Sequence, residues 1–237
     1  MVTASPPYAI PLLWLLGVAV AGFVVFLAYR QGLVAQVFET DRTRLSAVII
    51  ALAIFGTLHA GWRLWRLASE EQRLHACIAL LRARPDAPLG YEHGLAGAYF
   101  AARLEQDATT ERSELRDAME LTTVLGERAR QHHAHGRFLA GALIKLGLLG
   151  TVVGFVLMLN SVGAVESFDT SDVQRIMTLM SQGMGVALYT TLVGLVTSMV
   201  LGAQYLLADQ YANRFVGLAA EFANRELGAS RANATNT

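Results

Sequence analysis

Four long runs of uncharged residues constrain this chain more than any other feature of its sequence. The runs cover residues 8–29, 45–62, 138–160 and 176–208, and the only Asp, Glu, Lys or Arg within them is Lys145. An α-helix rises 1.5 Å per residue, so roughly 20 apolar residues cross the roughly 30 Å hydrocarbon layer of a bilayer. Only 16% of the residues are charged, against about 25% in soluble domains. The sequence therefore predicts an all-α integral membrane protein with four transmembrane helices.

The segments between these runs complete the predicted organisation. Residues 63–137 form a helical cytoplasmic segment between spans two and three, and residues 161–175 form a periplasmic loop. The run 176–208 exceeds the bilayer thickness, so we expect a short external segment ahead of the fourth span, and then a cytoplasmic tail over 209–237. The first run is longer than the apolar core of a signal peptide and follows no Lys or Arg, which favours an uncleaved first span.

Arginine counts predict the orientation in the membrane. The 63–137 segment contains eleven arginines, whereas the loop opposite contains only Arg175. The excess of basic residues marks the cytoplasmic side, so both termini are predicted to be cytoplasmic in a bacterial inner membrane. Within the segment, two prolines and a glycine over 84–90 break the helix, and 92–131 has the apolar spacing of one long helix.

No sequence motif supports catalysis. A phosphate-binding GxxxxGK, a zinc-ligand CxxC and a GxSxG nucleophile elbow are all missing, so we expect neither an enzyme nor a bound cofactor. His132, His133 and His135 invite a metal site, but no Cys or carboxylate stands at ligand spacing, which favours a polar collar beside the membrane. The net charge is zero, so no nucleic-acid partner is expected.

Small and hydroxyl-bearing residues share one face on each of the last two spans. On span three, Gly150 and Gly154 form a GxxxG pair that lets helix backbones approach closely in lipid. Hydroxyls beside such glycines either hydrogen-bond to their own helix or line a narrow wet passage for a small cation. The predicted face comprises Gly147, Gly150, Thr151 and Gly154 on span three, and Gly183, Ala187, Thr190, Thr191, Gly194, Thr197 and Ser198 on span four.

The spans contain no Asp or Glu, and Lys145 lies near the predicted cytoplasmic end. Hydroxyls do not exchange protons near neutral pH. If the chain conducts protons, the titrating carboxylate must come from a second protein.

The stretches LGLLGTVVG (146–154) and GMGVALYTTLVGL (183–195) resemble the proton-channel family of flagellar stator A subunits, TolQ and ExbB. The resemblance covers about residues 138–212. Two spans ahead of the cytoplasmic segment resemble the stator A arrangement. So does Val186, where the TolQ and ExbB branch has a glutamate.

The resemblance implies a ring of five subunits around two copies of a single-span MotB-, ExbD- or TolR-like partner with an essential Asp. It implies that Thr151 and Thr191 line the ion pathway and face that Asp. Thr190 beside Thr191 resembles the paired threonines of sodium-driven stators, so both H⁺ and Na⁺ remain open. The predicted function is an ion-conducting subunit of a rotary motor. A TolQ- or ExbB-like energiser of an envelope process, a secondary transporter and a non-conducting scaffold are the alternatives.

Overall fold

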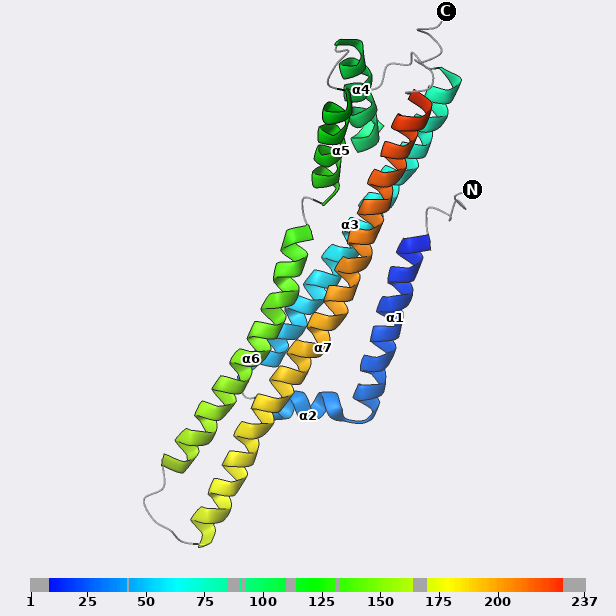
Figure 1. Cartoon of the computed structure of the whole chain (residues 1–237). Coiled ribbons are helices and arrows are strands. Elements are labelled where there is room, and N and C mark those ends of the chain that lie inside the picture. Colours follow the sequence, from blue (N-terminus) through cyan, green and yellow to red (C-terminus); the bar gives the residue numbers. More distant parts are fainter. Residues whose placement is uncertain are drawn as a thin grey trace, which may run out of the picture. The chain divides into compact units, whose positions relative to one another are not determined.

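The computed structural model describes residues 9–41, 43–84, 90, 93–109, 114–130, 133–163 and 170–227. These residues form helices and short connections, which confirms the all-α prediction (Figure 1). The α-helices are α1 (Ala9–Arg30), α2 (Leu33–Thr40), α3 (Leu45–Ala83), α4 (Gly94–Thr109), α5 (Glu114–Arg130), α6 (His133–Gly163) and α7 (Thr170–Phe222). A π-helical turn, Ala223–Leu227, follows α7.

Within the part of the chain that the structure describes, four helices are long and apolar enough to cross a membrane, as the uncharged runs predicted. The candidate spans are Pro11–Arg30, Leu45–Ala83, His135–Asn160 and Val173–Arg225. Two of these helices are much longer than a span requires. At 1.5 Å per residue, the 39 residues of α3 and the 53 residues of α7 extend about 58 and 80 Å, against roughly 30 Å of hydrocarbon. Both helices therefore continue beyond the uncharged runs 45–62 and 176–208.

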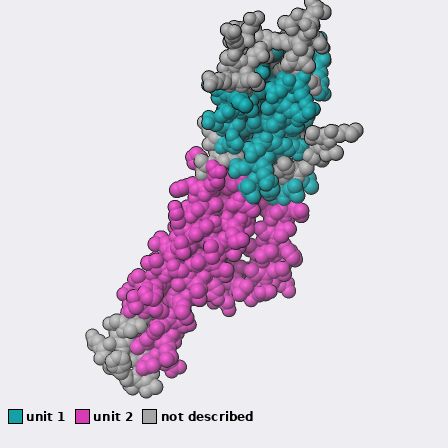
Figure 2. All heavy atoms as spheres, viewed as in Figure 1, with its two compact units in different colours: residues 1–14, 61–134, 206–237 teal, residues 15–60, 135–205 magenta. Residues whose placement is uncertain are grey.

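The described residues form two compact units (Figure 2). Unit 1 takes its residues from 1–14, 61–134 and 206–237, and unit 2 from 15–60 and 135–205. Unit 1 has an aromatic core that includes Phe100 and Phe215, both fully buried. Unit 2 has a smaller core around Leu143 and Leu201. Most of the uncharged sequence thus belongs to unit 2, and the charged segment between spans two and three belongs to unit 1.

The prediction of one long helix over 92–131 was wrong, because unit 1 contains the two helices α4 and α5 there. The hydroxyl groups of Tyr99 and Thr122 lie 3.2 Å apart. In one continuous helix these residues would be about 35 Å apart along the axis. The helices instead pack against each other, so that Tyr99 and Leu125 both lie in the core.

The start of α4 depends on a glycine and a carboxylate. Gly94 has a φ of +79°, a left-handed conformation that favours glycine. The Glu70 side chain of α3 approaches so closely that a Cβ at position 94 would contact it. Its Oε2 accepts a hydrogen bond of 2.8 Å from the Leu95 amide. A carboxylate at this position satisfies an amide that the helix itself leaves unpaired.

In unit 2, Asp41 organises the start of α3. The Asp41 side chain is 5% exposed and accepts hydrogen bonds from the Ser46 amide at 2.6 Å and the Thr43 amide at 3.0 Å. The Thr43 hydroxyl donates to the same carboxylate at 2.6 Å. Burial alone raises the pKa of Asp41, but these hydrogen bonds outweigh burial and hold the pKa below its usual value.

We expect Asp41→Asn to lower the free energy of unfolding by about 1 kcal/mol near neutral pH, because asparagine keeps one acceptor oxygen but replaces the other with an NH₂ group that cannot accept from the Ser46 or Thr43 donors. Because the folded pKa of Asp41 is lowered, its contribution is present above the ordinary value of 3.8 and is lost as the pH falls through the folded value. Thermal unfolding of both proteins in detergent should therefore give melting temperatures that converge below about pH 4. Glu39→Gln, an exposed change on α2, is the control and should leave the melting temperature unchanged.

Candidate functional site

The centre of unit 2 is an antiparallel contact between α6 and α7 in which backbones nearly touch (Figure 1). A Cβ placed on Gly154 would lie 2.6 Å from the Gly183 carbonyl oxygen and 2.7 Å from the Ala187 nitrogen. A Cβ on Gly194 would lie 2.8 Å from the Leu143 carbonyl oxygen. No side chain larger than hydrogen fits at these positions, because backbone atoms of the opposite helix occupy the space.

The remaining predicted glycines belong to the same contact. Gly147 faces Gly194 and Thr190, whose Cα and carbonyl oxygen lie 3.2 and 3.3 Å from its ideal Cβ position. Gly150 lies against the Thr190 side chain, which a Cβ at position 150 would overlap. The structure therefore brings together the small residues that the sequence predicted on one face of each span.

Two hydroxyl groups of α7 donate across this contact. The Thr191 hydroxyl donates to the Gly147 carbonyl at 3.0 Å. The Ser198 hydroxyl donates to the Ala140 carbonyl at 2.8 Å. A carbonyl within a helix normally accepts from the amide four residues further along the same helix. The hydrogen bonds from Thr191 and Ser198 are additional to these, and the close approach of the two backbones makes them possible.

The other hydroxyl groups donate within their own helices. Thr190 is fully buried and lies within hydrogen-bonding distance of the Val186 and Ala187 carbonyls, at 2.8 and 3.1 Å. Thr197 donates to the Val193 carbonyl at 2.6 Å. Thr151 donates to the Leu148 carbonyl at 2.5 Å. Thr151 and Thr191 are half-buried, whereas Thr190 is fully buried.

The α6–α7 face contains hydrogen-bond acceptors but no acidic side chain. A hydroxyl has one donor and two acceptor lone pairs, and the donors of Thr151 and Thr191 are both used by carbonyls. Their oxygens can therefore accept a proton donor or coordinate a cation. Neither 138–160 nor 176–208 contains Asp or Glu, and Val186 is 2% exposed. This face can receive a protonated carboxyl or a cation but cannot supply the titrating group.

The sequence interpretation missed one end of the contact. Gly136 of α6 packs against the Tyr205 ring of α7, which a Cβ at position 136 would overlap. Gly136, Ala140 and Leu143 continue the three- and four-residue steps that lead to Gly147, so the signal was present in the sequence. The interpretation stopped at residue 138, where the uncharged run begins.

The described histidines include His59 of α3, which lies outside the predicted collar of His132, His133 and His135. His59 of α3 lies 2.8 Å from the Tyr205 hydroxyl through its Nδ1 and stacks on Phe55. His132 lies outside the described residues. Among the residues that the structure describes, no group of His, Cys, Asp and Glu side chains is arranged to hold a metal ion.

Comparison with known proteins gives a family match. Residues 92–219, more than half of the chain, match the model of the MotA/TolQ/ExbB proton channel family. The match begins well before the predicted resemblance over 138–212 and includes α4 and α5. No curated protein and no solved structure matches the chain.

A methyl group at position 154 should weaken the α6–α7 contact. Because its nearest neighbours are backbone atoms, the helices must separate, and overpacking of this kind costs about 1–3 kcal/mol. We therefore expect Gly154→Ala to lower the melting temperature of the purified protein in detergent by several degrees.

Gly141→Ala on α6 and Gly202→Ala on α7 are matched controls, because no atom lies within 4 Å of a Cβ at either position. Both should leave the melting temperature unchanged or raise it slightly. Equal destabilisation by all three substitutions would contradict the described contact.

Proposed function

The chain belongs to the MotA/TolQ/ExbB proton channel family, and we propose that it is the ion-conducting subunit of a rotary motor or stator complex in the bacterial inner membrane. Proton or sodium flow through this complex does mechanical work by way of a single-span partner that carries an essential Asp. The observation that supports this proposal best is the α6–α7 face, which has hydroxyl oxygens free to accept but contains no acid.

The two half-buried threonines are proposed to form the ion pathway. With their donors engaged, the oxygens of Thr151 and Thr191 complement a protonated Asp or a bare cation and repel an ionised carboxylate. Thr190 is fully buried and fills the space that Gly150 leaves open. Its proposed part in the pathway is to fix the spacing of α6 and α7 beside Thr191.

The remainder of the exposed surface suits lipid and further subunits. Large apolar side chains of α7 project away from the contact, with Leu188 64% and Met199 75% exposed. The apolar window of α1 has no buried residues. These surfaces support a homo-oligomer in the bilayer, for which we propose five subunits around two copies of the partner. Ion binding neutralises the partner's Asp, its release recharges the Asp, and the ring turns relative to the partner.

A TolQ- or ExbB-like energiser of an envelope process is the second candidate function. It uses the same face, so the pathway residues do not distinguish it from a flagellar-type motor. Four candidate spans and a valine at position 186 favour the motor. The neighbouring reading frame offers a direct test. We expect a short protein with one N-terminal span, an Asp within it and a periplasmic domain, and its absence would argue for a non-conducting scaffold.

Thr191→Val tests the pathway, because it keeps the side-chain shape and removes the oxygen. A lost hydrogen bond to a charged or transferring group costs about 1.5–3 kcal/mol, so ion uptake should fall about tenfold or more. The measurement is uptake into vesicles that contain the chain and its single-span partner. Co-purification of the partner should be unchanged.

Two further variants make this test specific. Thr191→Ser restores the oxygen and should recover most of the uptake. Thr178→Val removes an exposed hydroxyl of α7 that donates only to the Gln174 carbonyl, and it should have no effect. Full uptake by Thr191→Val would exclude Thr191 from the pathway.

The positions of the threonines favour H⁺ over Na⁺. Sodium requires several oxygen ligands, and the buried Thr190 hydroxyl lies against its own helix. We therefore expect uptake to persist when sodium is replaced by potassium, and to depend on the pH gradient. Loss of uptake in potassium alone would identify a sodium-driven complex.

A further inference from the structure

Helix α2 connects the first two candidate spans, and its position gives the level of the membrane surface, meaning the height along the membrane normal. The uncharged runs on either side of it end at residue 29 and begin again at residue 45, so residues 30–44 lie on one side of the bilayer. In Figure 1, α2 runs across the ends of α1 and α3, whereas α6 and α7 continue past it. The ion pathway does not use α2.

The residues of α2 divide into an apolar half and a polar half. The helical repeat places Leu33, Val34, Val37 and Phe38 on one half, and Gln36, Glu39 and Thr40 on the other. Val37 is buried in unit 2, whereas Leu33 and Phe38 are 44% and 51% exposed. An amphipathic helix at a membrane lies in the plane of the headgroups with its apolar half toward the acyl chains. The exposed Leu33 and Phe38 therefore suit contact with lipid.

Contacts with α3 show which part of α7 shares the level of the second span. The Nδ1 atom of His59 lies 2.8 Å from the Tyr205 hydroxyl. The two helices run in the same direction (Figure 1). Leu45, where the uncharged run of α3 begins, precedes His59 by fourteen residues, and the same step back from Tyr205 leads to Thr191. The outer end of the second span is thus level with Thr191.

A separate contact with α2 gives the same level. The Tyr189 hydroxyl donates to the Gln36 side-chain oxygen at 3.3 Å. Gln36 belongs to the polar half of α2, so α7 reaches the side of α2 that faces away from the acyl chains. Tyr189 precedes Thr191 by two residues. From this level inward, residues 191–208 extend about 27 Å, close to the roughly 30 Å of hydrocarbon.

The exposed surface of α7 changes character at this level. Between 191 and 208 every exposed side chain is apolar, namely Leu192, Leu195, Val196, Met199, Ala203 and Leu206. Between Val173 and Tyr189, polar side chains are exposed beside apolar ones, namely Gln174, Arg175, Thr178, Ser181 and Gln182. Exposed polar side chains are costly in hydrocarbon. The surface of α7 therefore suits lipid on the inner side of Tyr189 and water on the outer side.

We propose that α2 binds the lipid headgroup layer on the side predicted to be periplasmic, and that α6 after Thr151 and α7 before Tyr189 project beyond the hydrocarbon. Residues 170–188 of α7 extend about 28 Å along its axis. The two helices stay paired in this projecting part, because Gly154 of α6 packs against the Gly183 backbone of α7. The outer portion of the uncharged run of α7 is therefore external.

The level of the surface also determines where the proposed ion pathway begins. Thr191 is level with the outer end of the second span, and Thr151 follows Gly150, which packs against Thr190. Ions from the predicted periplasmic side therefore reach both hydroxyls without crossing the bilayer. This consequence rests on the proposed function. The position of the membrane surface does not, because it follows from contacts of α2, α3 and α7 alone.

Fluorescence quenching by lipid measures the level directly. Each variant of the full-length protein has one cysteine at an exposed position, in a Cys77→Ala background, and carries a bimane label. The labelled protein is reconstituted into phosphatidylcholine vesicles that contain a lipid with a nitroxide on its headgroup or deep in its acyl chain. Two matched pairs are compared, Met184→Cys with Leu195→Cys on α7 and Leu159→Cys with Ile144→Cys on α6, and Phe38→Cys reports on α2.

The acyl nitroxide should quench the labels at positions 195 and 144, and this quenching should be lost at positions 184 and 159. The headgroup nitroxide should quench the label at position 38. Position 159 is the most demanding probe, because Leu159 is apolar and 52% exposed although it lies in the projecting part. Melting temperatures equal to that of the Cys77→Ala parent show that each variant folds.

Equal quenching within either pair overturns the proposal, since the membrane would then not end at the level of α2. An unquenched label at position 38 overturns it as well, because α2 would not lie on the lipid surface. Ion uptake is not measured in this experiment. A failure of the Thr191→Val prediction would therefore leave the membrane level unaffected, and the two proposals can fail separately.

Discussion

The direct approach of the α6 and α7 backbones is the constraint on which the rest of unit 2 depends. Lipid tails are as apolar as leucine, so two helices gain little from hiding apolar surface and associate through close packing and hydrogen bonds. Gly154 and Gly183 provide the packing, since backbone atoms fill the space where their side chains would be. The same proximity brings the Gly147 carbonyl within reach of Thr191. A helix pair with leucines at these positions would lack both the contact and the interhelical bond.

This packing also determines what the face can do chemically. Hydroxyl groups are tolerated in lipid because a neighbouring carbonyl accepts their proton. Once Thr151 and Thr191 have donated, only their lone pairs remain, and the face becomes an acceptor surface beside an apolar one. An acceptor surface has no titrating group of its own. An acid on the proposed partner complements this surface, because the helix pair has already used its own hydroxyl donors.

The spans were predictable from sequence, because every charged residue in hydrocarbon is costly and its absence over about 20 residues is a strong signal. The ends of the helices could not be predicted in the same way. A charge such as Arg63 ends the apolar run without ending the helix, and α3 continues to Ala83. The division into α4 and α5 was also missed, because residues 92–131 contain no proline and their helical spacing suits one helix or two equally well. Packing of Tyr99 and Phe100 in the core of unit 1 decides between them.

The small-residue face was predicted for a related reason, since helical stepping places Gly150 and Gly154 together whatever surrounds them. The three- and four-residue spacing does not reveal how far each helix is rotated about its own axis. Thr190 and Thr191 differ by about 100° around α7, and the contact with Gly150 buries the first while the second stays half-buried. Two threonines of equal promise in the sequence therefore have different environments.

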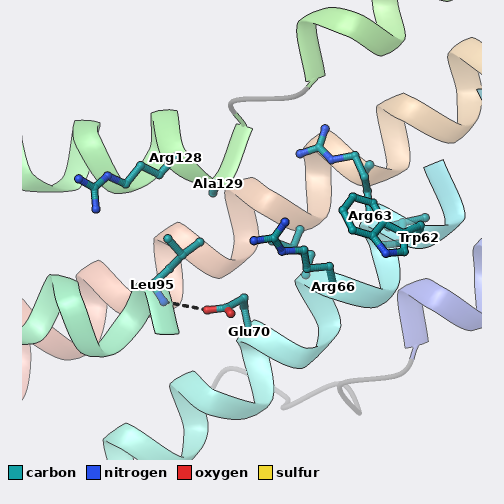
Figure 3. Close-up of a pocket in the computed structure, with 10 residues that line it drawn as sticks. Trp62, Arg63, Arg66, Glu70, Leu95, Arg128 and Ala129 are labelled. Atoms are coloured by element: carbon teal, nitrogen blue, oxygen red, sulfur yellow. Dashed lines mark hydrogen bonds between the residues drawn. The ribbon is translucent and has the colours of Figure 1, made fainter. Parts of the chain in front are cut away.

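The two units differ in where they place charge. Unit 2 excludes charge from the uncharged runs, with Lys145 as the exception, and its buried carboxylate, Asp41, lies between two of these runs. Unit 1 buries charge but pairs it: Glu71 is 1% exposed, accepts a hydrogen bond from the Tyr211 hydroxyl and lies 3.6 Å from Arg214. A buried carboxylate is tolerable only with such partners. The neighbouring carboxylate of α3 has partners as well, because Glu70 forms an ion pair with Arg73 and accepts a hydrogen bond from the Leu95 amide (Figure 3).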